Sequence, residues 1–494
     1  MRSTSLVPSA LALLAGSVLL ACITDSSERN APAPEGQPDT AAASAALHGC
    51  RPKNDKHDKI ENGEELTNPN GRHATLSTRD GHHLDTDNAF FQPLGTNGRA
   101  CVTCHTAEDG FSFTPASAQQ RFEDSCGTDP LFRTNDGSNN PNADVSTLDA
   151  KRAAYSLLLT RGLIRIHLPI PATAQFELVG VDDPYGNSTA TELSLFRRPL
   201  ASSNLKFGPV IMWDGRDANL KQQALEATTG HAEGAAPSDA VLQSIVDFES
   251  ALFTAQEKLT GVGRTNEGGA GGGTAFLATV PFTLNENHPF PSCTTTTPPS
   301  CNAGPISVTT NDVFDIYNAW ATSDDAGQKA VARGQVVFNT KRFVDPAVGP
   351  AHPVTCSNCH NTGNTGGFSS GFTPPAPPFG GIPTVAVSAP PFRAGLPLYT
   401  FAAKAGATTG TGAPVPVGTI VKSTDPGMAL RSGLWRDMNR FKIPQLRGLS
   451  ARAPYFHNGM SPTLAAVVQH YDTQFAIGMT DQEKSDLTAF LASL

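Results

Sequence analysis

The sequence has little charge, no block of basic residues and, outside its first residues, no hydrophobic run that could meet a membrane. Charged residues make up 16% of the 494 residues, and the formal net charge is -9. Because nucleic-acid-binding proteins gather Lys and Arg into a stripe or block, this composition argues against nucleic acid as a partner. The chain is too long for one ordinary domain, and its 45 Gly and 39 Pro predict long loops.

The one candidate membrane segment lies at the start and is typical of an export signal. Arg2 supplies a positive charge, and the apolar stretch 6–20 that follows is short for a transmembrane helix. It ends in Leu19-Leu20-Ala21-Cys22, which predicts a lipoprotein signal over 1–22 with Cys22 as the lipid-bearing residue. An ordinary cleaved signal with an incidental cysteine is the alternative. Both alternatives predict the oxidising periplasm or the cell surface. In the lipoprotein alternative, the lipid anchor is the only membrane contact.

Two five-residue motifs indicate the cofactor. Cys101-Val102-Thr103-Cys104-His105 and Cys356-Ser357-Asn358-Cys359-His360 are both C-x-x-C-H, the attachment motif for c-type haem. Two thiols at this spacing reach the two vinyl groups of one porphyrin, and the adjacent imidazole becomes the proximal iron ligand. A redox C-x-x-C pair or half of a zinc site would not need the histidine, and no further Cys pair completes a zinc site. The sequence therefore predicts two covalently bound haem c groups, with His105 and His360 as axial ligands.

The other cysteines fit disulfides in an exported protein. Apart from Cys22, they are Cys50, Cys126, Cys293 and Cys301, and four cysteines allow three pairings. Cys293 and Cys301 bracket a Thr/Pro run that suits a small disulfide loop. Cys50 with Cys126 would then join two parts of the first domain.

The spacing of the motifs predicts a mainly α fold, with two cytochrome c-like haem domains and long Gly/Pro-rich insertions. The predicted segments are a flexible tether and N-terminal extension over 23–75, a first haem domain over 76–260, a Gly/Thr/Pro-rich insertion over 261–315, and a second haem domain over 316–494 with an insertion over 361–426. Helical periodicity predicts helices over 149–164, 238–259 and from 324 to 338. Two short helices are predicted at the end, one starting at Ser461-Pro462 and one with a Thr480/Glu483 capping box.

Two further motifs resemble a known family. Trp213-Asp214-Gly215-Arg216 follows the first haem motif, and Ala453-Pro454-Tyr455-Phe456-His457-Asn458-Gly459 with Thr463-Leu464 follows the second. Together with the paired haem motifs, they resemble the bacterial dihaem cytochrome c peroxidase and MauG superfamily, over roughly 90–494. The resemblance is much less specific for any one activity within that superfamily.

The resemblance implies a peroxide-reactive first haem. The family's distal glutamine and glutamate lie ten and twenty residues beyond the Trp, which gives Gln223 and Glu233 here. A carboxylate can move the peroxide proton between the two oxygens, and an amide can stabilise developing charge. Typical family members carry a distal His in the loop before this Trp. Between His105 and Trp213 the chain has only His167, interpreted as structural, so the first iron is expected to have an open site.

For the second haem the resemblance implies Tyr471 as the iron ligand opposite His360. Family peroxidases have a Met fourteen residues after the His of the second motif, whereas His457 plus fourteen is Tyr471, as in MauG-type enzymes. A phenolate favours ferric iron, whereas a thioether favours ferrous iron. Met460, Met479 and His470 are rival ligands. Trp213 matches the family's tryptophan between the two haems, where an indole can carry electrons or holes.

The family also shares a calcium ion between its haem domains, partly held by an Asn upstream of the Trp-Asp-Gly-Arg motif. Near that place this chain has Arg197-Arg198-Pro199, so the sequence leaves open whether the chain binds a calcium ion.

The function that these features favour is a dihaem c-type peroxidase. Hydrogen peroxide would react at the first haem, and electrons from a small redox protein or another donor would pass through Trp213. One alternative is MauG-like oxidation of a protein side chain or an organic compound. The other is a dihaem electron carrier that is not an enzyme.

Overall fold

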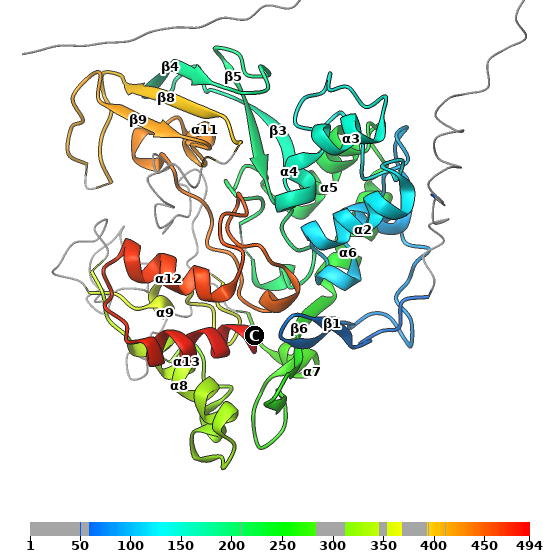
Figure 1. Ribbon diagram of the computed structural model, residues 1–494, viewed down its shortest axis with the longest axis vertical. Helices are drawn as coiled ribbons and strands as arrows, with labels where there is room; N and C mark the ends of the chain where they lie inside the picture. The colour runs from blue at the N-terminus through cyan, green and yellow to red at the C-terminus, as the bar shows by residue number, and fades with distance from the viewer. Residues whose placement is uncertain are drawn as a thin grey trace, which may run out of the picture.

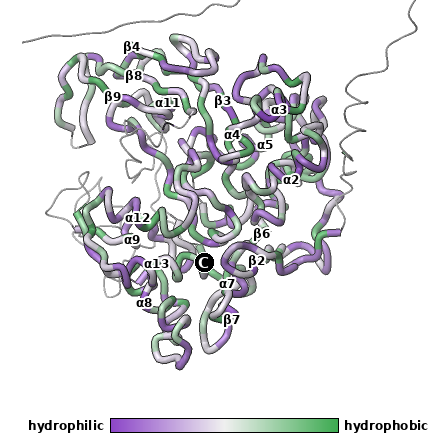
Figure 2. Tube along the Cα trace, viewed as in Figure 1, coloured by the Kyte–Doolittle hydropathy of each residue, from purple (hydrophilic) through white to green (hydrophobic). Residues whose placement is uncertain are grey.

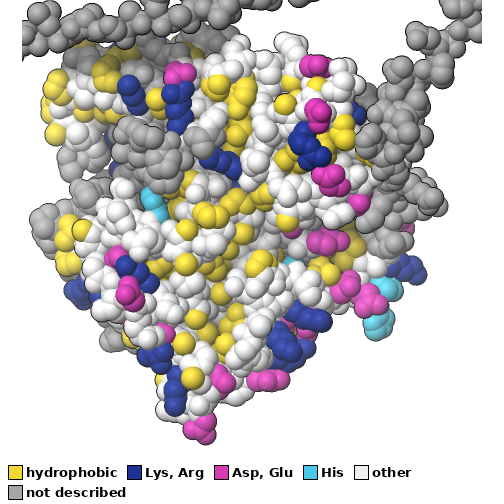
Figure 3. Space-filling model, viewed as in Figure 1, with side chains coloured by type: hydrophobic (Ala, Val, Ile, Leu, Met, Phe, Trp, Pro, Cys, Tyr) yellow, Lys and Arg dark blue, Asp and Glu magenta, His cyan; other side chains and the backbone are white. Residues whose placement is uncertain are grey.

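The computed structural model describes residues 50, 59–208, 210–282, 312–344, 353–367, 393, 395–410 and 412–494. Figure 1 shows α2 to α6 on one side of the molecule, and α8, α9, α12 and α13 grouped together on the other side. A sheet of β4, β8 and β9 lies beyond the second group. On the face seen in Figure 3, hydrophobic side chains gather toward the middle of the molecule.

The helices, most of them short, have the following bounds: α2 (Pro115–Ser125), α3 (Leu148–Ala154), α4 (Ser156–Arg161), α5 (Leu220–Glu226), α6 (Asp239–Ser250), α7 (Gly273–Thr279), α8 (Ala326–Thr340), α9 (Cys356–Cys359), α11 (Ala429–Ser432), α12 (Leu464–Gln474) and α13 (Asp481–Ala492). Short 3-10 helices lie at Ala89–Phe91, Cys101–Thr103, Ala107–Asp109, Leu205–Phe207, Asn318–Thr322, Trp435–Asp437 and Leu449–Ala451, and a π-helical turn lies at Ala227–His231. Within the described ranges, none of the helices is long and apolar enough to cross a membrane.

The strands have the following bounds: β1 (Leu66–Asn68), β2 (Gly71–Ser77), β3 (Ile164–Pro169), β4 (Phe176–Asp182), β5 (Glu192–Arg197), β6 (Leu252–Leu259), β7 (Gly263–Arg264), β8 (Leu398–Ala403) and β9 (Ile420–Ser423). They form three sheets, in the orders β1-β2-β6-β7, β3-β5 and β4-β8-β9. All of the pairings are antiparallel.

The prediction of a mainly α fold is wrong. Helices account for only 34% of the structure and strands for 17%. Strands β8 and β9 lie within 361–426, a stretch that the sequence predicted as a loop insertion. Tyr399 and Phe401 of β8 are fully buried, and β8 pairs with β4, more than 200 residues earlier. These strands were missed because Gly and Pro dominate their surroundings and their partners are distant in sequence.

The predicted helix over 238–259 is correct only in its first half. Ser238 caps α6 by accepting a hydrogen bond from the Val241 amide, and Ile245 and Phe248 face the core. The helix ends at Ser250, and Leu252–Leu259 is strand β6, paired with β2. Almost every side chain of β6 is buried, so its apolar residues continued the helical stripe by coincidence.

The second group of helices follows the sequence prediction more closely. Asp325 caps α8, and Thr480 with Glu483 forms the predicted capping box of α13. Helix α12 begins two residues later than predicted, because Thr463 and not Ser461 caps it. Hydrophobic and hydrophilic residues mix along α12 and α13, as expected for helices with one buried face (Figure 2).

Helices α8 and α13 pack unusually closely at Gly334. A Cβ atom at this position would lie 2.0 Å from the Asp486 carbonyl oxygen on α13. The surrounding core contains Phe314, Phe338 and Phe490, whose rings meet edge to face or at a tilt. This core supports the segment that carries the second C-x-x-C-H motif, because Phe338 also contacts the His360 ring.

Candidate functional site

The first C-x-x-C-H motif forms a 3-10 helix followed by a fixed imidazole. Cys101 and Cys104 both carry thiols. The His105 Nδ1 lies 3.1 Å from the Phe111 carbonyl oxygen. Since a carbonyl only accepts hydrogen bonds, Nδ1 donates and Nε2 is the ring nitrogen left for a metal. Burial lowers the pKa of His105 to about 4, so the imidazole is neutral, as a metal ligand must be.

The second motif repeats this geometry. Cys356 and Cys359 carry thiols at the two ends of α9. The His360 Nδ1 donates to the Gly366 carbonyl oxygen at 2.6 Å, which is again six residues further along the chain. Burial also lowers the pKa of His360 to about 4. Two segments far apart in sequence therefore present the same set of atoms.

Each motif lines a large, mostly apolar cavity. The cavity beside Cys101, Cys104 and His105 has about 1320 Å³ of empty space, and the cavity beside the second motif has about 1500 Å³, both including their open mouths. Each motif therefore opens onto a concave, mostly apolar space, which is the kind of place where proteins bind cofactors.

The residues of both cavities fit a haem group. Each cavity has two thiols at the attachment spacing and one neutral imidazole with Nε2 open. In the second cavity both ring nitrogens of His457 are buried, and neither has a hydrogen-bond partner among the described residues. Buried polar groups are normally hydrogen-bonded, so this imidazole fits the polar edge of a bound group.

A thin wall separates the two cavities. The residues that line both of them are Arg198, Pro199, Leu200, Ala201, Trp213 and Lys442. The Trp213 Nε1 donates to the Arg198 carbonyl oxygen at 2.8 Å, and the Trp213 carbonyl accepts from the Lys442 amide at 2.8 Å. His457 meets the Trp213 ring edge to face at 6.3 Å and stacks on Phe441 at 3.8 Å. Trp213 is thus held between the cavities through its indole nitrogen and its backbone carbonyl.

The Asp and Arg of the Trp-Asp-Gly-Arg motif belong to a buried charge cluster. Arg197 donates to Asp214 at 2.6 Å and to both oxygens of Asp425, at 2.6 and 2.9 Å. Arg216 donates to the other oxygen of Asp214 at 3.1 Å. Arg197 and Arg216 together balance the charge of the two carboxylates. Within the described ranges no group of three or more His, Cys, Asp or Glu side chains could hold a metal ion. These residues therefore do not fit a calcium ion at this place.

The structure separates the two residues predicted to act on peroxide. Gln223, on α5, lines the first cavity. Glu233 does not line it: its side chain is exposed, and its backbone has a φ of 54° and accepts a hydrogen bond from Thr96. His167 also lies outside the cavity, on β3 beside Arg165.

Sequence reasoning missed His231, which lines the first cavity. The sequence prediction considered a distal histidine only in the chain before Trp213, where the family carries one. The helical period could have identified it. Between the start of α5 and the end of the π-helical turn, the residues that line the cavity are Leu220, Gln223, Ala224, Ala227, Thr228, His231 and, directly after the turn, Ala232. Residues three and four apart share one face of a helix, so His231 continues the Gln223 face and Glu233 leaves it.

In the second cavity the structure brings Tyr471 near the haem motif. Tyr471 lies on α12 and lines the cavity with His360 and Met479. Burial raises the pKa of its phenol, and the Cys359 and Cys356 thiols raise it further. Of the rival ligands, Met479 lines this cavity, whereas Met460 and His470 lie outside its lining.

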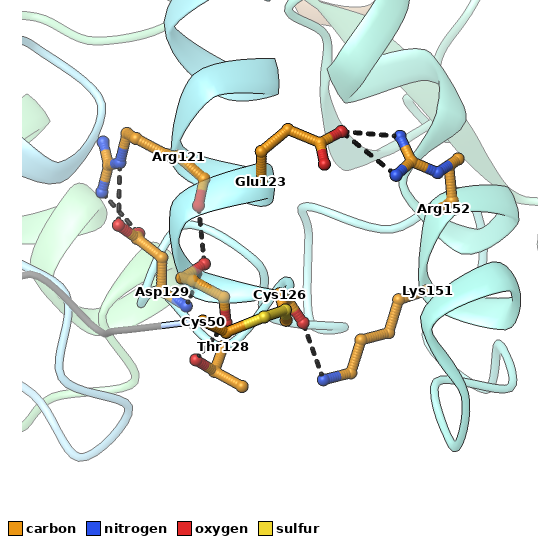
Figure 4. Close-up of a disulfide and its surroundings, with 9 residues drawn as sticks. Cys50, Arg121, Glu123, Cys126, Thr128, Asp129, Lys151 and Arg152 are labelled. Carbon is orange, nitrogen blue, oxygen red and sulfur yellow. Dashed lines mark hydrogen bonds and ion pairs between the residues drawn. A yellow bond between two sulfur atoms is a disulfide. The ribbon is translucent and has the colours of Figure 1, made fainter. Parts of the chain in front are cut away.

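A disulfide joins Cys50 to Cys126 at the end of α2, with Cα atoms 5.7 Å apart. This is the pairing expected from the sequence. Figure 4 shows Lys151 donating to the Cys126 carbonyl oxygen and Arg121 paired with Asp129 beside the disulfide. The predicted lipidation site Cys22 and the predicted pair Cys293 and Cys301 lie outside the described residues.

Comparison with known proteins finds relatives over a short part of the chain. A segment is 43% identical over 65 residues to the cytochrome-c peroxidase IdrP2 of Denitromonas iodatirespirans, covering 12% of this chain and 18% of that protein. The cytochrome-c peroxidase IdrP1 of the same organism is 36% identical over 70 residues, covering 12% of this chain and 19% of that protein. The chain thus matches about a fifth of the length of these curated relatives. No family model matches the chain.

Among solved structures, a MauG-like protein associated with microbial copper homeostasis overlaps 82% of this chain and 87% of its own. The identity over this overlap is 14% and the TM-score is 0.36. The curated relatives confirm, over the matched segment, the resemblance to the dihaem cytochrome c peroxidase and MauG superfamily.

Proposed function

We propose that the protein is an exported dihaem c-type oxidoreductase that reacts with hydrogen peroxide in its first cavity. The observation that carries this proposal is that two C-x-x-C-H motifs, far apart in sequence, line two adjacent cavities with the same set of thiols and imidazole. Bound haem would supply redox-active iron. Cys101 and Cys104 would hold one haem and Cys356 and Cys359 the other. The similarity to cytochrome-c peroxidases supports peroxide as the substrate.

The chain's own groups in the first cavity suit this chemistry. His105 offers Nε2 as the iron ligand, because its Nδ1 is bound to Phe111. The Gln223 amide can donate a hydrogen bond to a peroxide oxygen and so stabilise charge that develops on it. Apolar neighbours such as Ile164 and Leu220 line the same cavity and lower the polarity around that hydrogen bond, which strengthens it.

Electrons would reach the first cavity through the wall. Trp213 lines both cavities and is fixed at its indole nitrogen and its carbonyl, which supports a role in electron transfer between them. In the second cavity His360 would be one axial ligand and Tyr471 the other. The reductant would be a small redox protein or another electron donor.

A second candidate function is MauG-like oxidation of a protein side chain or an organic compound. The position of Tyr471 in the second cavity favours it, because a tyrosine that binds iron as phenolate stabilises oxidised iron. In both cases we propose a location in the periplasm or at the cell surface, with Cys22 as a lipid anchor.

The test is to produce the chain in a host that attaches haem c and to count the haem groups per chain. We expect two, a high-spin ferric signal from one of them, and peroxide-dependent oxidation of a reduced small cytochrome c. One haem group or none would refute the proposal. Two six-coordinate haem groups without turnover would instead identify an electron carrier. Peroxide consumption that oxidises an added protein or organic substrate, but not the cytochrome, would identify the MauG-like activity.

A further inference from the structure

The first cavity contains an ordered histidine for which the proposed function has given no role. His231 ends the π-helical turn Ala227–His231 and lines the cavity together with His105 and Gln223. Its side chain is 43% exposed, whereas its partner Asp136 is 8% exposed. The His231 imidazole is therefore partly open to the cavity, whereas the carboxylate that holds it is buried.

An ion pair of Asp136 and Arg99 holds the His231 imidazole. The His231 Nδ1 lies 2.5 Å from one carboxylate oxygen of Asp136, and Arg99 is bound to the other. Arg99 is itself fixed by the carbonyls of Leu131, at 2.7 Å, and Pro130, at 2.9 Å. Although burial raises the pKa of Asp136, Arg99 and His231 keep it below its ordinary value, so the carboxylate stays charged. A charged carboxylate fixes Nδ1 as the donor, which leaves Nε2 as an acceptor.

The backbone of His231 is also held. Its carbonyl oxygen accepts from the Asn97 amide side chain at 2.8 Å and from that of Asn135 at 3.2 Å. Asp136 and Arg99 line the same cavity. An imidazole oriented by a buried carboxylate is the arrangement that proteins use for a general base.

We propose that His231, oriented by Asp136, is the acid–base residue of the first cavity. The inference rests on the proposed function, since it concerns hydrogen peroxide in that cavity. His231 Nε2 takes a proton from one peroxide oxygen and returns it to the other oxygen, which leaves as water when the O–O bond breaks. Peroxide is the oxidant, and the two electrons that it gains come from the haem-bound protein. His231 ends the step unchanged, and Gln223 hydrogen-bonds to the oxygen that stays.

This assignment displaces the exposed Glu233, the residue that the family offset predicted. Glu233 lies two residues beyond His231, and its side chain is exposed outside the cavity lining. The two residues therefore form a matched pair for experiments, because they are near each other in sequence and differ in their access to the cavity.

The experiment measures cyanide binding to the ferric two-haem protein, which needs no electron donor and no turnover. Hydrogen cyanide must lose a proton when it binds, so a base in the cavity accelerates the step. We expect His231→Leu and His231→Gln to slow cyanide association by at least about tenfold, Asp136→Asn to slow it less, and Glu233→Gln to leave it within about twofold. Imidazole, which binds without losing a proton, should bind all variants at similar rates.

Equal cyanide rates in wild type and both His231 variants would overturn the inference. So would a change from a low-spin to a high-spin first haem in His231→Gln, because His231 would then be an iron ligand. Haem content and thermal unfolding of each variant exclude a folding defect, and the Gln variant retains a polar side chain of similar length. A wild-type protein that binds cyanide with this dependence but does not consume peroxide would refute the proposed function and leave His231 as a base for another acidic ligand.

Discussion

Single side chains decide which groups can reach a ligand in the first cavity. Gln223 and Glu233 were predicted together from family offsets, yet only Gln223 lines the cavity. The difference comes from helical geometry, because α5 and the turn that follows it direct one face inward. Of the two residues that the sequence spacing predicts, the structure therefore places one at the cavity and the other outside its lining.

The Gln223→Leu variant should slow the reaction with peroxide by on the order of a hundredfold, because it removes an amide donor from an apolar cavity. Glu233→Gln should change the rate by less than about twofold. The measurement is the second-order rate constant for peroxide in stopped-flow absorbance. A slow Glu233→Gln variant with normal haem content would show that the glutamate enters the cavity.

The Tyr471→Phe variant should change the ferric spectrum of the second haem and raise its midpoint potential by on the order of 0.1 V. The physical reason is that an anionic oxygen next to His360 would be lost, and axial ligands set haem potentials over a wide range. Spectroelectrochemistry measures both effects. Met460→Leu is the control, since that residue lies outside the cavity lining; an unchanged Tyr471→Phe protein would leave Met479 as the ligand.

Secondary-structure elements show where prediction from sequence succeeds. The capping box of α13 and the Ser238 cap of α6 were predicted from the sequence because capping depends on residues only three apart. The C-x-x-C-H motifs were found for the same reason. Strands β6 and β8 were not, since their pairing with β2 and β4 depends on contacts far along the chain. His231 was missed because the prediction considered histidines only before Trp213, whereas His231 lies on the inward face of α5 and the turn that follows it.

The Gly334→Ala variant should destabilise the protein by about 1–3 kcal/mol, although alanine is ordinarily the better helix former by roughly 1 kcal/mol. The added methyl group would lie 2.0 Å from the Asp486 carbonyl oxygen and would push α8 and α13 apart. Denaturant unfolding of the haem-bound protein measures the change. Gly81→Ala is the matched control, because a Cβ there meets no atom within 4 Å; equal stabilities would mean that the helices separate at no cost.

At the scale of the whole molecule, the Arg197 cluster joins three distant parts of the chain. Arg197 comes from β5, Asp214 from the loop before α5, and Asp425 from just after β9. All three side chains are almost completely buried, at 2–4% exposure. A guanidinium that satisfies two carboxylates at once is worth most in such a place, because removing it leaves buried charge.

Arg197→Met should destabilise the protein by about 3–5 kcal/mol at pH 7. In the wild type, burial alone would raise the pKa of Asp214, but Arg197 outweighs burial and holds that pKa below its ordinary value. The stabilisation that the Asp214–Arg197 pair contributes is therefore lost only as the pH falls through the lowered pKa. Without Arg197, burial would raise the pKa of the Asp214 carboxyl, and the folded variant would bind a proton before the unfolded chain does. The stability difference should therefore shrink between pH 7 and pH 5, as measured by denaturant unfolding. Arg152→Met, at an exposed ion pair with Glu123, should change stability by less than about 1 kcal/mol at either pH.

The pairing of β4 with β8 governs the order in which this chain can fold. Strand β4 ends at Asp182, but its partner spans Leu398–Ala403, so a growing chain exposes the β4 edge until more than 200 further residues arrive. Unpaired edges recruit other strands, and non-local pairing is slow. A fragment that stops before Leu398 should therefore aggregate, and the intact chain requires protection of that edge until β8 has been made.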